Sequence, residues 1–148
     1  MGKVMARVKL TNGWDLENAN RGLVKPEEVR SIEIEALIDT GATQLVLPEE
    51  IRALLDLPIQ GRRKVRYADG RVASVPWAPV HIEILGRAMV CDALIESAGT
   101  PALIGQIPLE GLDLLVDPKT REVRVNPESP DMPLMEILVT SELAGARA

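Results

Sequence analysis

In the stretch Glu35-Ala36-Leu37-Ile38-Asp39-Thr40-Gly41-Ala42-Thr43-Gln44-Leu45-Val46-Leu47, a short polar turn separates two runs of apolar residues. From position 31 to the turn, apolar and polar residues largely alternate, which is the period of a strand with one buried face. We therefore expect Asp39 to leave a hydrophobic core. A carboxylate in that position needs hydrogen bonds or a partner charge. The hydroxyl of Thr40 and the unobstructed backbone amide of Gly41 can supply such bonds.

The tripeptide Asp39-Thr40-Gly41 alone is also typical of an ordinary turn, because Asp and Gly are frequent turn residues. Its surroundings favour a more specific interpretation. The stretch quoted above, followed by Pro48, resembles the active-site strand and turn of the retropepsin-like (clan AA) aspartic proteases. A second stretch is similar to the second signature of that family, in which two apolar residues and a glycine pass beneath the catalytic turn and lead into a helix. It reads Pro101-Ala102-Leu103-Ile104-Gly105-Gln106-Ile107-Pro108-Leu109.

This resemblance covers about residues 29–125 and implies both a fold and a site. The implied fold is all-β with one or two short helices: a retropepsin-like closed β-barrel of the acid protease half-domain type, with a flap hairpin. The implied catalytic residue is Asp39. The implied active-site support consists of Thr40, Gly41, Ala42, Leu103, Ile104 and Gly105. The implied substrate groove and flap consist of Thr43, Gln44, Arg66, Tyr67, Ala68, Asp69, Gly70, Arg71 and Val72.

The chain contains a single Asp-Thr-Gly, whereas the chemistry of this family uses two facing carboxylates that share one proton. An active enzyme would therefore bring Asp39 against Asp39 of a second subunit, since a two-fold contact brings identical residues together. The sequence departs from retroviral members at Thr43 and Gln106, where an acidic residue and an arginine commonly form a supporting ion pair. Because both charged partners are absent together, no buried charge is left unpaired.

The composition limits the class of protein. The chain has 148 residues, of which 46% are apolar and none is Phe, so it can form one domain with an aliphatic core. No signal peptide or membrane-length apolar run is evident, so we expect no membrane association and a cytoplasmic location. The net charge of −5 argues against nucleic acid as a partner. Cys91 is expected to be a packed thiol and His81 an exposed strand residue; they are the only Cys and His, so neither a metal site nor a cofactor is expected.

The rest of the chain reads as short elements of a single domain, residues 1–148. Residues 12–28 are predicted to be a long connection with a possible helical turn after Pro26. Short helices are predicted from Pro48 and from Pro108, because proline is favoured at the first helical position. Further strands are predicted at residues 4–10, 80–85 and 88–95. Hairpins are predicted at residues 63–76 around Asp69-Gly70, and at residues 114–125 around Asp117-Pro118-Lys119-Thr120.

Two features stay open between a functional and a structural interpretation. The first hairpin is expected to be the flap, but its basic residues are expected to be solvated edge-strand charges that prevent aggregation. These residues are Arg62, Arg63, Lys64, Arg66 and Arg71. In retropepsins the chain termini interleave across the dimer interface, so residues 1–11 and 134–139 are possible interface strands. Alternatively, the apolar tail at 134–139 completes the sheet of its own subunit.

Three functions are compatible with these observations, since a fold does not by itself establish an activity. The leading hypothesis is a homodimeric aspartic endopeptidase that hydrolyses a peptide or protein substrate through paired Asp39 carboxylates. The alternative is a non-catalytic retropepsin-like peptide-binding or dimerisation module. A third interpretation is a small β-rich adaptor in which the two signatures are coincidental.

Overall fold

The computed structural model describes residues 3–138, which form nine strands, three α-helices and one 3-10 helix. With 43% of residues in strands and 17% in helices, the predicted β-rich class is confirmed, but the expectation of one or two helices is wrong. The strands are β1 (Met5–Thr11), β2 (Ser31–Ile38), β3 (Leu45–Pro48), β4 (Gly61–Arg66), β5 (Val72–Ile84), β6 (Arg87–Glu96), β7 (Leu103–Ile104), β8 (Leu114–Asp117) and β9 (Glu122–Val125). The helices are α1 (Gly13–Asn20), η1 (Pro26–Glu28, the 3-10 helix), α2 (Glu49–Leu54) and α3 (Gln106–Gly111).

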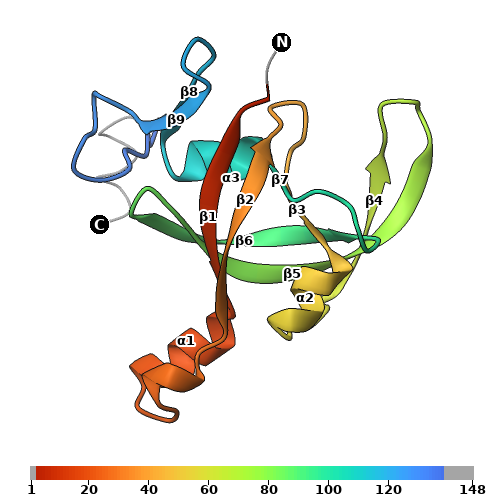
Figure 1. Ribbon diagram of the computed structural model, residues 1–148, viewed down its shortest axis with the longest axis vertical. Helices are drawn as coiled ribbons and strands as arrows, with labels where there is room; N and C mark the ends of the chain where they lie inside the picture. The colour runs from red at the N-terminus through yellow and green to blue at the C-terminus, as the bar shows by residue number, and fades with distance from the viewer. Residues whose placement is uncertain (1–2, 139–148) are drawn as a thin grey trace.

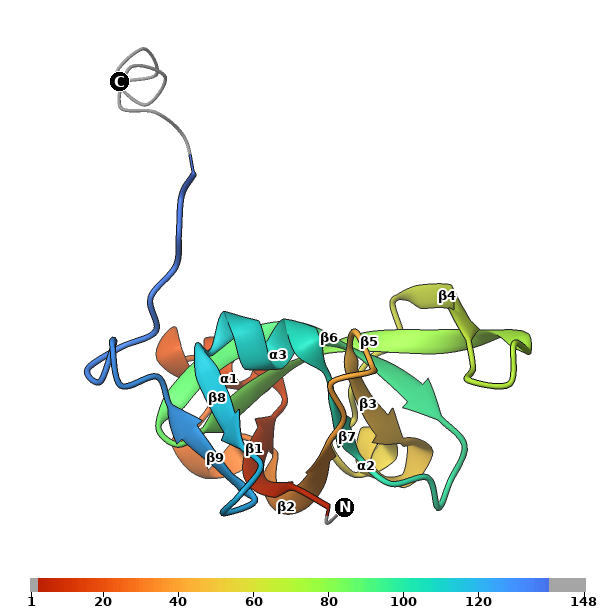
Figure 2. The same ribbon diagram turned by 90° about the horizontal axis from the view of Figure 1, so that it is seen from above.

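Seven strands form one sheet in the order β1-β2-β7-β3-β6-β5-β4 (Figure 1). The first strand also pairs with β5 through Lys9, Leu10 and Thr11. This second pairing closes β1, β2, β7, β3, β6 and β5 into a ring and leaves β4 outside it, paired with the first half of β5. The small β8–β9 hairpin and α3 lie beside the ring on the side away from β4 (Figure 2).

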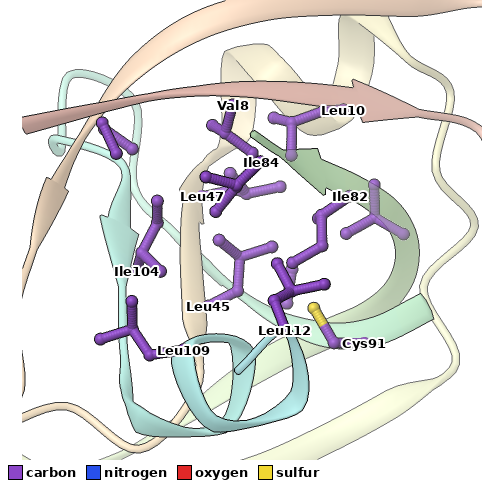
Figure 3. Close-up of a cluster of buried hydrophobic side chains, with 14 of the residues drawn as sticks. Val8, Leu10, Leu45, Leu47, Ile82, Ile84, Cys91, Ile104, Leu109 and Leu112 are labelled. Carbon is purple, nitrogen blue, oxygen red and sulfur yellow. The ribbon is translucent and has the colours of Figure 1, made fainter. Parts of the chain in front are cut away.

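The ring closes around an aliphatic core, as the composition predicts. In β1, for example, Ala6, Val8 and Leu10 are buried while the residues between them are exposed, so the alternation of the sequence sets the inward face. Complete burial of a side chain as large as Val8 or Leu10 stabilises the fold by about 1.5–3 kcal/mol. Figure 3 shows the centre of this core, which contains Val8, Leu10, Leu45, Leu47, Ile82, Ile84, Cys91, Ile104, Leu109 and Leu112.

The lone cysteine and the lone histidine have different environments. Cys91 is buried in the core, and this burial raises the pKa of its thiol to about 12, so the prediction of a packed thiol is confirmed. His81 was expected to be exposed but is half-buried, with a ring nitrogen, Nδ1, that is enclosed without a hydrogen-bond partner. His81 lies within β5 between two paired strands, opposite Thr11 of β1 and Val90 of β6, and it borders a surface hollow that Leu16 and Ala19 of α1 also line.

Helix α1 lies within residues 12–28, which the sequence predicts to be a long connection. None of its residues is buried, so its sequence has no apolar stripe to reveal it. The helix is instead capped by Asn12, whose side chain accepts a hydrogen bond from the backbone amide of Asp15 at 3.0 Å and donates to the carbonyl of Leu55 at 2.9 Å. The predicted helical turn after Pro26 is confirmed as η1.

The other local predictions agree closely with the structure. Helix α2 begins directly after Pro48, and both predicted hairpins are present, as β4–β5 and β8–β9. The second arm of the first hairpin and the strand predicted at 80–85 are one continuous strand, β5. Helix α3 begins at Gln106, two residues before the predicted start at Pro108.

After β9 the chain is anchored by a compact polar network. The carboxylate of Asp113 accepts hydrogen bonds from the hydroxyl of Ser129, the side-chain amide of Asn126 at 3.1 Å and the backbone amide of Leu134 at 3.0 Å. Buried Arg87 donates to the backbone carbonyls of Leu112, Asp113 and Ser129. These bonds hold residues 126–134 against α3 and the start of β6.

Beyond this anchor, residues 134–138 form no strand, and Ile137 and Leu138 are 81% and 90% exposed. These residues therefore do not complete the sheet of their own subunit. Position 139 of the predicted interface segment lies outside the described residues, as do positions 1 and 2. The described part of the other segment, β1, pairs with β2 and β5 of the same chain. The interface roles of both segments stay predictions.

Candidate active site

Asp39 follows β2 directly, at the end where that strand pairs with β7. The pairing is parallel and joins Leu37 to Leu103 and Ile38 to Ile104. The backbone amide of Asp39 continues it by donating to the carbonyl of Ile104 at 3.0 Å. The main chain of Asp39 is therefore held by the second predicted signature, as the sequence analysis expected for Leu103 and Ile104.

The turn after Asp39 holds the carboxylate in place. The backbone amide of Gly41 donates to Oδ1 of Asp39 at 3.0 Å, and the amide of Ala42 donates to the carbonyl of Asp39 at 3.1 Å. A Cβ atom at position 41 would lie 3.2 Å from the same Oδ1, so a larger residue would crowd the carboxylate. The side chain of Asp39 is half-buried, while Thr40 and Gly41 are exposed. One oxygen of the carboxylate is thus positioned by the backbone at a place that water can reach.

Gly105 lies directly against this turn. A Cβ atom at position 105 would be 2.4 Å from the carbonyl oxygen of Gln44 and 2.6 Å from that of Ala42, distances that no side chain tolerates. Its neighbours complete the contact, because the amides of Gln106 and Ile107 donate to the carbonyls of Ala42 and Thr43, both at 2.9 Å. The two segments can therefore approach each other this closely only because residue 105 has no side chain.

The same contact explains the early start of α3. The first amides of a helix have no partner within the helix, and here the turn provides partners for the first two. Pro108 is the third residue of α3, where its missing N–H leaves no donor unsatisfied. Thr43 and Gln106, the positions without the expected ion pair, are both exposed and are joined to the opposite segment through their backbones.

The predicted flap residues lie at the tip of the β4–β5 hairpin. The amide of Tyr67 donates to the carbonyl of Arg71 at 2.9 Å, and Gly70 adopts a φ of 86°, a conformation that glycine enters without steric cost. In Figure 1 the loop between β2 and β3 and the hairpin rise on the same side of the ring as two separate projections. The structure thus joins residues 39–44 to residues 103–107 by direct contact, and places residues 66–72 on a separate projection.

The sequence reading missed the residues that brace the hairpin. The hydroxyl of Tyr67 donates to Oε2 of Glu96 at 2.5 Å, and this bond raises the pKa of Tyr67. Arg63 donates to Oδ2 of Asp92 at 2.8 Å. Both acidic partners lie on β6, almost thirty positions away in the chain, so no local pattern marks them as contacts of the hairpin.

Residues 3–138 offer little support for other kinds of functional site. No group of three His, Cys, Asp or Glu side chains is arranged there to hold a metal ion. No helix in that range is both long and apolar enough to span a membrane. Two surface hollows of about 310 and 440 Å³ border α1 and do not include the Asp39 turn.

Comparison with known proteins gave no match, either to a protein-family model or to a curated protein sequence.

Proposed function

We propose that this protein is a retropepsin-like aspartic endopeptidase that is active as a homodimer. The observation that carries the proposal is the set of backbone hydrogen bonds that hold the main chain and the carboxylate of Asp39. One segment, residues 103–107, binds both the amide of Asp39 and the carbonyls of the turn that follows it, while Gly41 holds the carboxylate. An ordinary surface turn needs no such second segment, whereas a catalytic carboxylate must be held rigidly.

The proposed reaction uses two copies of Asp39, one from each subunit. Two close carboxylates cannot both be ionised easily, so the pair retains one proton. The ionised member takes a proton from a water molecule, and the resulting hydroxide attacks the peptide carbonyl carbon while the protonated member donates its proton to the carbonyl oxygen. The tetrahedral intermediate, which carries two hydroxyl groups, then breaks its C–N bond. The amine nitrogen takes the proton that came from water, and one hydroxyl group returns its proton to the other carboxylate. This leaves a carboxylic acid and an amine, and restores the single shared proton of the pair. Gly41 keeps each carboxylate in position, and Thr40 is assigned a hydrogen bond across the dimer.

The peptide is proposed to bind in extended form between the Asp39 turn and the β4–β5 hairpin. Extended peptides gain affinity from backbone hydrogen bonds and specificity from pockets for alternate side chains. Thr43 and residues 68–71 at the hairpin tip are exposed and can make such contacts, while Tyr67 is half-buried.

Two observations support a second copy of the chain as the missing partner. A single Asp-Thr-Gly is present, so the chemistry requires another subunit. Apolar residues 134, 135, 137 and 138 are exposed after the Asp113 anchor, and such a segment marks a surface that another molecule covers. A cytoplasmic location stays a prediction.

The test is cleavage of a peptide library by the wild-type chain and by Asp39→Asn. Asn is nearly isosteric with Asp but cannot act as the base, so we expect a loss of about 10²–10⁴-fold or more in rate with an unchanged melting temperature. Asp131→Asn removes the same charge from an exposed position far along the chain and is the matched control. Equal cleavage by Asp39→Asn and the control would remove Asp39 from the mechanism.

The same experiment distinguishes the proposed enzyme from the alternative, a non-catalytic peptide-binding or dimerisation module. A wild-type chain that is dimeric by sedimentation and binds library peptides without cleaving them would support a binding module. A monomer that does neither would contradict both the enzyme and the dimerisation module.

A further inference from the structure

The β4–β5 hairpin has two faces with different charge environments. Residues directly opposite each other in an antiparallel pair lie on the same face of the sheet. On one face, Arg63 donates to Asp92 at 2.8 Å, and its guanidinium lies 4.4 Å from the centre of the Trp77 ring. Tyr67 lies on this face too and donates to Glu96. The cation at the centre of this face therefore already has an acidic partner.

The opposite face carries three cations, Arg62, Lys64 and Arg66. They lie opposite Pro76, Ser74 and Val72, respectively. All three cations are exposed, and Arg62 is held by neutral acceptors, the hydroxyl and the carbonyl of Ser74 at 2.8 and 2.7 Å. Across residues 3–138, none of the three forms an ion pair, although most other arginines do.

This cationic face continues the interior side of the ring. Side chains of a strand alternate between its faces, and β5 is one strand from the hairpin into the ring. Ala78, Val80 and Ile82 of β5 point into the core, so Ser74 and the cations beside it lie on the same side of the sheet. Since the hairpin has left the ring at this point, no core covers them. In Figure 1 the hairpin and the loop between β2 and β3, which carries Asp39, extend to the same side of the ring.

The spacing of the cations fits an extended peptide. Side chains on one face of a strand repeat every two residues, at about 6.6–7 Å, and an extended peptide has the same repeat. Three cations in a row therefore match carboxylates on alternate residues of a peptide. At physiological salt, charges act over about 8 Å, so this face attracts acidic groups locally even though the whole chain has a net charge of −5.

We propose that Arg62, Lys64 and Arg66 select acidic peptides, namely extended segments with Asp or Glu at alternate positions, as the substrate class of the Asp39 site. This inference rests on the proposed function. Protection of an edge strand explains the presence of charges but does not require the cations of one face to be unpaired. Nucleic acid is less well matched, because this face carries no aromatic side chain for base stacking and the chain is acidic overall.

The experiment uses two peptides that differ only in carrying Glu or Gln at alternate positions. For the wild-type chain we expect kcat/KM to favour the Glu peptide by about 5- to 10-fold in 25 mM salt and by less than about 2-fold in 500 mM salt, since exposed ion pairs are weak and screened. In the double variant Lys64→Gln, Arg66→Gln the ratio should fall to about 1 at both salt concentrations. The matched control is Lys119→Gln, Arg121→Gln, which removes two exposed cations from the loop between β8 and β9 and should keep the wild-type ratio.

A second measurement separates this inference from the proposed function. Fluorescence anisotropy with Asp39→Asn reports binding of labelled Glu and Gln peptides without cleavage. Tighter binding of the Glu peptide that is lost in Lys64→Gln, Arg66→Gln supports the inference even if the wild-type chain cleaves nothing. Cleavage of both peptides at equal rates overturns the inference and leaves the proposed function intact. The inference is also overturned if neither peptide binds, or if single-stranded DNA of equal charge binds more tightly than the Glu peptide.

A charge-reversed variant guards against loss of fold. Lys64→Glu, Arg66→Glu should prefer a peptide with Lys at alternate positions over the Glu peptide. A variant with a normal melting curve that still favours the Glu peptide would contradict the assignment.

Discussion

Replacement of Gly105 by Ala tests the contact on which the candidate site depends. The added methyl group would overlap the carbonyl oxygens of Gln44 and Ala42 and approach the carbonyl carbon of Ala42 to 2.9 Å. These are backbone atoms, so no side-chain rotation relieves the overlap. The segment must instead move away from the turn, and the hydrogen bonds from Gln106 and Ile107 to the turn lengthen or break.

The size of the effect follows from these contacts. Overpacking costs about 1–3 kcal/mol, and the loss of two hydrogen bonds adds about 1 kcal/mol each, so we expect the free energy of unfolding to fall by about 3–5 kcal/mol. For a chain of this length, each kcal/mol corresponds to about 2–4 °C in Tm, so Tm should fall by about 6–20 °C. Any cleavage activity should fall as well, because the moved segment also binds the amide of Asp39.

The assay is urea unfolding followed by circular dichroism, with thermal melting as a second measurement. Gly13→Ala is the matched control, because a Cβ atom there has no neighbour within 4 Å, and its effect should stay within about 0.5 kcal/mol. If Gly105→Ala were as stable as Gly13→Ala, the two signature segments would not be in contact and the description of the site would be wrong.

Two further predictions concern the Asp113 anchor and the core. Hydrogen bonds from Ser129, Leu134 and Asn126 lower the pKa of Asp113 from 3.8 to about 2. A carboxyl group whose pKa is lowered by folding stabilises the folded state above its unfolded-state pKa, and this stabilisation is lost as the pH falls through the folded-state pKa. The free energy of unfolding should therefore decline between about pH 4 and pH 2, and Asp113→Asn should flatten this decline in urea titrations. An unchanged pH profile in that variant would contradict the anchor. Cys91, with its buried thiol of pKa about 12, should resist iodoacetamide at pH 8 in the folded chain and react in 6 M urea, as followed by mass spectrometry; rapid labelling of the folded chain would place the thiol at the surface.

The sequence located residues that the structure joins through the backbone, but it did not reveal the side-chain partners of the hairpin. Asp39, Gly41 and the Leu103-Ile104 pair were located by motif, and the structure joins them through backbone hydrogen bonds. Such bonds depend on chain direction and small residues, which a motif records. The partners of Tyr67 and Arg63 were not predicted, because Glu96 and Asp92 become neighbours of the hairpin only when β6 pairs with β5.

Helix α1 and the environment of His81 were missed for a related reason. The helix has no buried residue, so it lacks the periodic apolar pattern by which amphipathic helices are recognised. The helix is capped by Asn12, which resembles a turn residue in the sequence but donates a hydrogen bond to Leu55 in a distant segment. His81 is half-buried within β5, which is paired there with both β1 and β6.

The amino-acid sequence by itself determined the elements that rest on local chemistry. Alternation of apolar residues specified β1 and β2, the pair Asp69-Gly70 specified the first hairpin, and an aliphatic composition specified the kind of core. These features arise from backbone preferences and from side chains within a few residues of each other. Only the tertiary structure decided how the ring closes through β1 and β5, and that Arg63 has an acidic partner on β6 while Arg62, Lys64 and Arg66 on the opposite face have none among the described residues. These properties depend on which distant strands pair and on which face each strand presents, and the packing of the whole core sets both.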